Sequence, residues 1–320
     1  MLHWVKSKAV AAKIYARYGI LKVRRGARQR ANQRRLNREG GGVLTFHLES
    51  PVGLFAHLSW CLQIAAYCHP RGIVPRFVCT SPQYGDGGED WFKMLFEQPK
   101  LAAFAPRVLE NADAVQVREF EELPFYTQRL LTELTPAAKL QCEYFPVSPR
   151  LLAQADEFAQ TNFPRGSTLG CHFRGTDKGI EAKRVAYETM THCLHARLAK
   201  LGSNPVLFIA TDEAAFIKHA RSALNGVRVV SADVHRSTTG QALHLDPALR
   251  GRPQAEAALI DALLLARCDH LIKSPSALSA WSTLFNPQLG VTLVGRPFAH
   301  AMFFPENVLV EAGAELVETP

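Results

Sequence analysis

The sequence predicts an α/β protein of two Rossmann-like domains, the C-terminal one built on a doubly wound parallel sheet. Two observations on composition support this fold class. The chain has 320 residues, about two average domains, and 47% of them are hydrophobic, which is enough for two cores. A third is that short apolar runs alternate with longer helical patterns in the second half. This composition excludes disordered, collagen-like and disulfide-stapled proteins.

Three segments follow one another along the chain. Residues 1–42 form a basic arm or helix that ends in three glycines, which we expect to act as a flexible link. Twelve of the 37 basic side chains lie in the first 40 residues beside one acid, so the rest carries 25 basic and 28 acidic residues. Residues 43–148 are predicted to form an N-terminal α/β domain. Residues 149–320 are predicted to form a C-terminal Rossmann-like domain.

The N-terminal domain opens with a β-α-β pattern. Apolar runs predict strands at 43–48 and 73–78, with a turn at 50–53 and a long apolar helix at 54–68 between them. Residues 80–110 are rich in loop-forming residues, and 115–149 show little periodicity. This half is therefore predicted to be irregular.

The C-terminal domain has a clearer alternation. Strands are predicted at 169–173, 206–210, 227–231, 270–273 and 291–294, and helices at 185–200, 213–224, 253–267 and 276–285. Ligands of such sheets bind at the carboxyl ends of the strands. The residues that directly follow each strand are therefore the candidates for function.

The segment CHFRGTDKGIE (171–181) follows the first of these strands. It contains two cations, Arg174 and Lys178, and two acids, Asp177 and Glu181. Arginine makes bidentate contacts with phosphate, and lysine adds a point charge. The segment therefore predicts a phosphate site, and a surface loop with ordinary ion pairs is the alternative.

Polar residues also follow two other strands. Thr211 or Asp212 could cap the next helix, and Asp212 could equally contact a ligand or orient Arg174. Ser274 and Ser276 open a helix whose free N–H groups could bind phosphate, although Ser276 could serve only as its N-cap. Asp261 lies inside the apolar helix ALIDALLLARCD, where a carboxylate needs a partner or a ligand.

Several motifs are missing from the sequence. It contains no G-x-G-x-x-G, G-x-x-x-x-G-K-[ST], G-x-S-x-G or H-E-x-x-H, which argues against dinucleotide oxidoreductases, P-loop NTPases, α/β-hydrolases and zincins. It also contains no D-x-D to hold a metal ion against a diphosphate. Seven cysteines without a C-x-x-C pair, and no signal peptide or membrane span, predict a cytoplasmic protein.

Three motifs resemble the nucleotide-binding half of the fucosyltransferase superfamily. They are HFRGTDK (172–178), FIATDE (208–213) and LIDALLLARCDHLIKSPSALS (259–279), in this order. That superfamily includes α-1,6-fucosyltransferases, rhizobial nodulation fucosyltransferases and protein O-fucosyltransferases. The resemblance implies a GT-B fold, GDP-fucose as donor, inversion at the sugar carbon and no metal or other cofactor. It also implies a glycan acceptor, of the bacterial envelope or an oligosaccharide, bound by the N-terminal domain.

The resemblance also implies roles for individual residues. Arg174 would grip the β-phosphate and stabilise the GDP leaving group, and His172 and Asp261 would recognise guanine. Glu181 would accept the proton of the acceptor hydroxyl. The remaining residues are a network that holds Arg174 (Asp177, Lys178 and Asp212), hydrogen-bond donors to phosphate (Ser274 or Ser276), and a loop glycine near the donor (Gly53).

The chain departs from the superfamily at Gly175, where a second consecutive arginine is often found. Lys183 or Arg184 is expected to compensate for the missing cation. Two alternatives remain open: a non-catalytic protein that binds nucleotide sugars or glycans, and a transferase that uses another GDP-sugar.

The basic arm suggests a partner of its own. Trp4, Tyr15 and Tyr18 beside a cationic face fit an anionic membrane surface, which residues 1–40 would bind as a peripheral anchor at the inner face of the membrane. A solubilising tail is an equally open interpretation. Nucleic acid is not expected, because residues 22–38 contain no aromatic side chain for base stacking and the rest of the chain is not basic.

Overall fold

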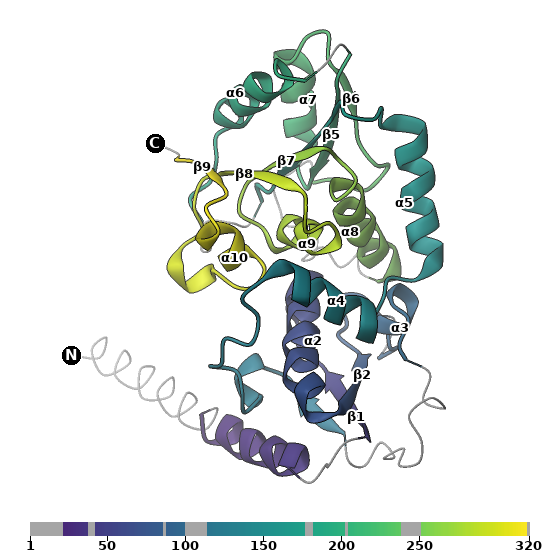
Figure 1. The fold of residues 1–320 in the computed structure, drawn as a ribbon, viewed down its shortest axis with the longest axis vertical. Helices are drawn as coiled ribbons and strands as arrows, with labels where there is room; N and C mark the ends of the chain where they lie inside the picture. The colour runs from purple at the N-terminus through teal and green to yellow at the C-terminus, as the bar shows by residue number, and fades with distance from the viewer. Residues whose placement is uncertain are drawn as a thin grey trace, which may run out of the picture.

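The computed structural model describes residues 22–37, 42–85, 88–99, 114–176, 182–201, 204–237 and 251–318. Within these ranges the chain forms two α/β domains, one above the other along the long axis of the molecule (Figure 1). Each domain contains one parallel sheet, of three strands in the first and six in the second. The predicted fold class is therefore confirmed.

The sheet of the first domain has the strand order β2-β1-β3. Its strands are β1 (Gly42–Leu48), β2 (Ile73–Cys79) and β3 (Val115–Val117). Helix α2 (Leu54–Cys68) connects β1 to β2 and is buried over most of its surface, which explains why its sequence is apolar nearly all round. The short helices α3 (Phe92–Leu95) and α4 (Leu134–Tyr144) lie in the half that showed no clear periodicity.

The sheet of the second domain has the order β6-β5-β4-β7-β8-β9. Its strands are β4 (Thr168–Phe173), β5 (Val206–Thr211), β6 (Arg228–Val230), β7 (His270–Lys273), β8 (Gly290–Val294) and β9 (Glu315–Val317). Its helices are α5 (Pro149–Asn162), α6 (Tyr187–Leu198), α7 (Ala214–Ala223), α8 (Arg252–Leu265), α9 (Ala277–Phe285) and α10 (Glu306–Glu311). Every strand and helix predicted for this half is present, with its ends shifted by a few residues. α5, β9 and α10 were not predicted.

Helices cover both faces of this sheet. β4 and β5 are buried along their full length, as their continuous apolar sequences require. Alternate residues of these strands pack against α6 and α7 on one face, and the others against α5, α8 and α9 on the opposite face. The sheet is therefore doubly wound, and its carboxyl edge carries β4, β5 and β7 side by side.

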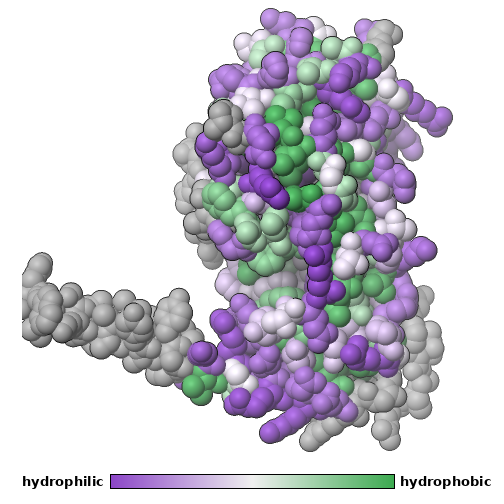
Figure 2. Space-filling view, turned by 60° about the vertical axis from the view of Figure 1, so that its left-hand side comes forward, coloured by the Kyte–Doolittle hydropathy of each residue, from purple (hydrophilic) through white to green (hydrophobic). Residues whose placement is uncertain are grey.

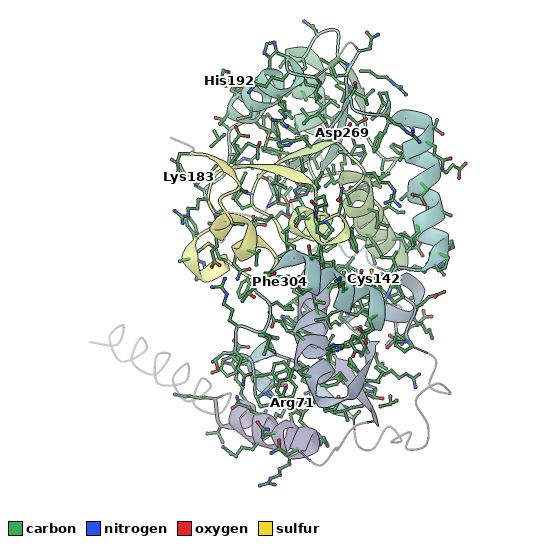
Figure 3. All side chains as sticks on the ribbon, viewed as in Figure 1. Arg71, Cys142, Lys183, His192, Asp269 and Phe304 are labelled. Carbon is green, nitrogen blue, oxygen red and sulfur yellow. The ribbon has the colours of Figure 1, made fainter. Side chains whose placement is uncertain are left out.

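The two domains share part of one hydrophobic core, because α2 and α4 of the first domain pack against α9 of the second. Ser59 of α2 contacts two segments of the second domain. Its hydroxyl lies within hydrogen-bond distance of the carbonyls of Phe55 (2.8 Å) and Phe304 (3.0 Å), and it accepts from Trp281 Nε1 (2.9 Å). Phe304 lies where the domains meet (Figure 3). These contacts fix the second domain against α2.

Residues 22–37 form a helix that packs against the first domain (Figure 1). Leu36 and Asn32 are buried, and Asn32 Nδ2 donates to the carbonyls of Gln116 (3.0 Å) and Glu122 (3.2 Å). Arg28 pairs with the fully buried carboxylate of Glu122. This part of the basic arm is therefore not the free appendage that its composition suggested, because acids at 119–122 hold it.

No helix in the part of the chain that the structure describes combines the length and the apolar character needed to cross a membrane. On the face shown in Figure 2, hydrophilic residues spread over both domains with hydrophobic ones between them.

Candidate functional site

Arg174 is the first residue after β4, the strand between β5 and β7 at the carboxyl edge of the second sheet. Its Nε lies 3.2 Å from Oδ2 of Asp212, which follows β5 and is 5% exposed. Its main-chain N–H donates to Ser274 Oγ (2.9 Å), which follows β7. Three neighbouring strand ends therefore hold one arginine, whose side chain is 23% exposed.

Asp212 organises the loop that follows Arg174. Its carboxylate accepts hydrogen bonds from the Gly175 N–H (3.1 Å) and from the Thr176 hydroxyl (2.6 Å) besides pairing with Arg174. The N-cap position of α7 is Glu213, with no side-chain cap. Asp212 therefore orients Arg174, and the alternative that it caps the helix is wrong.

Glu213 forms a second buried carboxylate site beside the first. It accepts two hydrogen bonds from Arg184 Nη2 (2.9 and 3.0 Å) and one from the Tyr187 hydroxyl (2.5 Å). Burial and this hydrogen bond raise the pKa of Tyr187 to about 12. Arg184 Nη1 also donates to the carbonyl of Gly175 (2.7 Å), so the network reaches the same loop.

The network explains why residue 175 is glycine. A Cβ at this position would overlap the carboxylate of Glu213, with Oε2 only 2.6 Å away. An arginine at position 175 would clash with Glu213 in its present position. Arg184, one of the two basic residues expected to compensate, contacts Gly175 and keeps 53% of its side chain exposed.

His172 and Asp261 are both buried, at 3% and 7% exposure. His172 is the last residue but one of β4, and its carbonyl accepts from the Ser274 N–H (3.0 Å). Asp261 lies on α8, and its Oδ1 has no hydrogen-bond partner among the described residues. Burial raises the pKa of Asp261 to about 7, against the charge of Arg236, which lowers it. This carboxylate is suited to a ligand that brings N–H donors.

The two serines after β7 differ in their contacts. Ser274 is 2% exposed and its hydroxyl accepts from Arg174, so it positions the arginine. Ser276 occupies the N-cap position of α9, yet its hydroxyl makes no capping hydrogen bond. Beneath them, the buried Lys273 ammonium contacts both carboxylate oxygens of Glu306 at 2.7 Å. This ion pair ties α10 to the end of β7.

The first domain faces this cluster with two loops. Gly53 precedes α2, and the main-chain N–H of Leu54 donates to the Tyr84 hydroxyl (2.8 Å). The charge of Arg174 lowers the pKa of Tyr84, although burial raises it more. Next to Tyr84, the Gln83 carbonyl accepts from the Gly251 N–H of the second domain (2.9 Å). Tyr84 was not predicted as a site residue, because its position in a glycine-rich loop is the only signal that the sequence gives for it.

Three predicted site residues, Asp177, Lys178 and Glu181, fall in 177–181 and lie outside the described residues. Their roles stay predictions. In the described part of the chain, no group of three or more His, Cys, Asp or Glu side chains is arranged to hold a metal ion.

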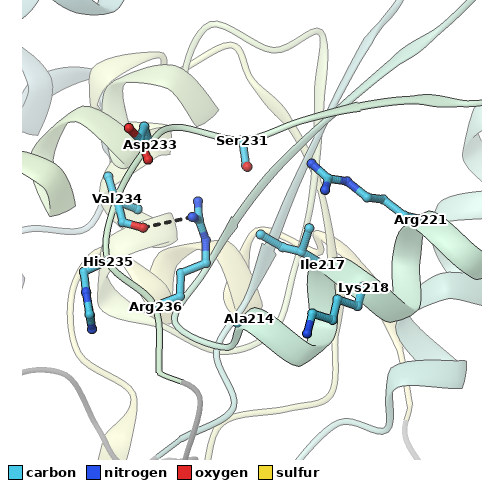
Figure 4. Close-up of a pocket in the computed structure, with 9 residues that line it drawn as sticks. All are labelled: Ala214, Ile217, Lys218, Arg221, Ser231, Asp233, Val234, His235 and Arg236. Carbon is cyan, nitrogen blue, oxygen red and sulfur yellow. Dashed lines mark hydrogen bonds between the residues drawn. The ribbon is translucent and has the colours of Figure 1, made fainter.

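A hollow of about 580 Å³ lies beside the site, between α7 and the loop that follows β6 (Figure 4). Lys218, Arg221 and Arg236 line it, and Arg236 Nη1 donates to the carbonyl of Val234 (2.9 Å). The same loop reaches the end of β5, where the N–H of Ser237 donates to the Asp212 carbonyl (2.8 Å). The hollow contains none of the predicted site residues.

The fold and this geometry can be compared with known proteins. No protein-family model and no curated protein sequence matches the chain. Its structure is similar to that of POFUT1 in complex with GDP, with a TM-score of 0.50, 10% identity, and coverage of 80% of this chain and 99% of that one. It is also similar to a mutant of Arabidopsis thaliana FUT1 in complex with GDP, with a TM-score of 0.50, 12% identity, and coverage of 87% of this chain and 76% of that one. The structure of NodZ α-1,6-fucosyltransferase soaked with GDP-fucose has a TM-score of 0.48 and 17% identity. The match covers 76% of this chain and 92% of that one.

The chain is thus structurally similar to fucosyltransferases over most of its length. The predicted GT-B arrangement of two α/β domains is confirmed at the level of the fold.

Proposed function

We propose that the protein transfers L-fucose from GDP-fucose to a glycan acceptor, with inversion at the sugar carbon and without a metal ion. The observation that carries the proposal is Arg174, held by Asp212 and Ser274 at the carboxyl edge of the second sheet. The fold shared with fucosyltransferases supports the choice of donor.

Arg174 would stabilise the departing diphosphate. Cleavage of the bond between the fucose anomeric carbon and the β-phosphate oxygen leaves its electron pair on that oxygen, where negative charge develops. A cation already fixed by Asp212 stabilises this charge without reorganising in the transition state. Removing such a group costs on the order of 100-fold in rate or more.

Asp261 and His172 would recognise guanine at the other end of the donor. The unpartnered Oδ1 of Asp261 is a suitable acceptor for the N–H groups of the guanine edge. A pyrimidine base offers a different pattern of donors, so this carboxylate would favour a GDP-sugar over a UDP-sugar.

Inversion requires the acceptor hydroxyl to attack the face of the sugar opposite the diphosphate. Its oxygen forms the new bond to the anomeric carbon as the bond to GDP breaks, and its proton passes to a base. Glu181 is the candidate for this base, and Asp177 and Lys178 would help to hold Arg174. All three remain assignments from the sequence.

The test is release of GDP from GDP-fucose in the presence of a panel of glycan acceptors. Release that depends on one acceptor, and falls at least 100-fold in Arg174→Ala, would support the transferase. A variant that keeps normal turnover would rule out the role of Arg174.

A non-catalytic nucleotide-sugar or glycan-binding protein is the second candidate, favoured by the single arginine before Gly175. It predicts GDP-fucose binding without GDP release for any acceptor. Equal release from GDP-mannose would instead indicate a transferase for another GDP-sugar.

For the basic arm we propose contact with an anionic membrane surface at the inner face of the membrane. Arg25 and Arg28 are paired with acids of the first domain, whereas Arg24, Arg30 and Arg34 are exposed on the helix of residues 22–37. Replacing the three exposed arginines with glutamine should abolish co-sedimentation with anionic vesicles. Unchanged sedimentation would leave only a solubilising role.

A further inference from the structure

The hydroxyl of Tyr84 has one hydrogen-bond partner in the described part of the chain. It accepts from the main-chain N–H of Leu54 (2.8 Å) at the start of α2, and Tyr84 as a whole is 4% exposed. A tyrosine hydroxyl can also donate one hydrogen bond. No acceptor for its proton lies among the described residues, and a buried donor without an acceptor is costly.

The ring of Tyr84 is held firmly in this position. It packs edge-on against Trp91 at 5.4 Å between ring centroids, and Trp91 in turn packs edge-on against His57 of α2 at the same distance. Trp91 is fully buried, and its Nε1 donates to Ser81 Oγ (3.2 Å). The hydroxyl is therefore preorganised and does not depend on a mobile side chain.

Tyr84 also lies where the first domain meets the predicted phosphate site. The adjacent Gln83 hydrogen-bonds Gly251 of the second domain, and the charge of Arg174 acts on the Tyr84 hydroxyl. Gly53 lies beside this hydroxyl, since a Cβ on it would stand 3.9 Å away, an ordinary van der Waals contact. An anion bound by Arg174 would find a second donor here.

We propose that the Tyr84 hydroxyl donates a hydrogen bond to a β-phosphoryl oxygen of the nucleotide sugar, from the side opposite Arg174. This assignment rests on the proposed function. A neutral donor from the first domain and a cation from the second would hold the same diphosphate. Donor binding would thereby join the two domains.

The test is calorimetric titration of GDP and GMP into the unmodified protein and Tyr84→Phe. A lost hydrogen bond to a charged group weakens binding roughly ten- to 100-fold. We expect this loss for GDP and a much smaller one for GMP, which lacks the β-phosphate.

Tyr144→Phe is the matched control, because it removes a buried first-domain hydroxyl that bonds His69 Nδ1 (2.8 Å). It should leave both affinities unchanged. If Tyr84→Phe lowers only the thermal stability and leaves the GDP-to-GMP affinity ratio intact, Tyr84 merely caps α2 and the assignment is overturned. If the unmodified protein binds no GDP, the proposed function fails together with the Tyr84 assignment. If it binds GDP and only the Tyr84→Phe result is negative, the Tyr84 assignment fails alone.

Discussion

Asp261→Asn is expected to stabilise the ligand-free protein while it weakens donor binding. Burial raises the pKa of this carboxyl from 3.8 to about 7, and its Oδ1 has no partner in the described structure. Such a shift corresponds to about 4 kcal/mol of unfolding free energy when the group is fully ionised. Because the folded state holds the proton more tightly, this stability is present at low pH and is lost as pH rises from about 4 to about 7.

The assay is chemical denaturation of the unmodified protein and Asp261→Asn at pH 5 and pH 8. Their difference in unfolding free energy isolates this group from His57 and His270, whose pKa values burial lowers to about 4. We expect the variant to gain about 1 to 3 kcal/mol more at pH 8 than at pH 5, because about a third of the loss already falls below pH 5. Equal differences at both pH values would refute the raised pKa of Asp261.

The same carboxyl predicts the pH dependence of donor binding. Only its ionised form accepts two guanine N–H groups, so GDP-fucose affinity should fall as pH drops below about 7. GDP-fucose is the right probe, since its diphosphate is a diester without a second phosphate ionisation in this range. Calorimetry should show the fall in the unmodified protein, and Asp261→Asn should bind weakly at every pH. A flat profile in the unmodified protein would contradict the guanine assignment.

Three further predictions concern packing around the site. Gly175→Ala should displace Glu213 and lower stability by about 1 to 3 kcal/mol in chemical denaturation, whereas an unchanged midpoint would mean that the loop adjusts freely. Lys273→Met should cost about 3 to 5 kcal/mol because it strands the Glu306 carboxylate, and adding Glu306→Leu should recover most of it; no recovery would contradict the ion-pair account. Leu36→Ala should cost at least about 2 kcal/mol if the helix of residues 22–37 is part of the folded first domain, and an unaltered melting temperature would show that it is not.

The regular elements of the second domain could be predicted from sequence because local pattern and burial agree there. β4 and β5 are continuous apolar runs between helices, which is how parallel strands covered on both faces must read. The first domain was harder to predict, since β3 has three residues and α3 has four. Elements this short carry no measurable periodicity, and long-range contacts hold them in place.

The candidate site was predictable where residues directly follow strands. Arg174, Asp212 and Ser274 come together because their strands are neighbours in the sheet. The contact of Arg184 and Glu213 with Gly175 depends on how a loop folds back, so the sequence could suggest compensation for the missing arginine but not its geometry. Tyr84 reaches the site from the other domain, and a contact between domains cannot be predicted from a local sequence pattern.

Calorimetric titration of GDP-fucose, beside GDP-mannose and UDP-glucose and with EDTA present, is the most direct test of the proposed donor site. We expect micromolar binding of GDP-fucose, little binding of UDP-glucose, and loss of binding in Arg174→Ala, whose melting temperature should stay near that of the unmodified protein. Absence of binding for every guanine nucleotide, or undiminished binding by Arg174→Ala, would contradict the proposed donor site.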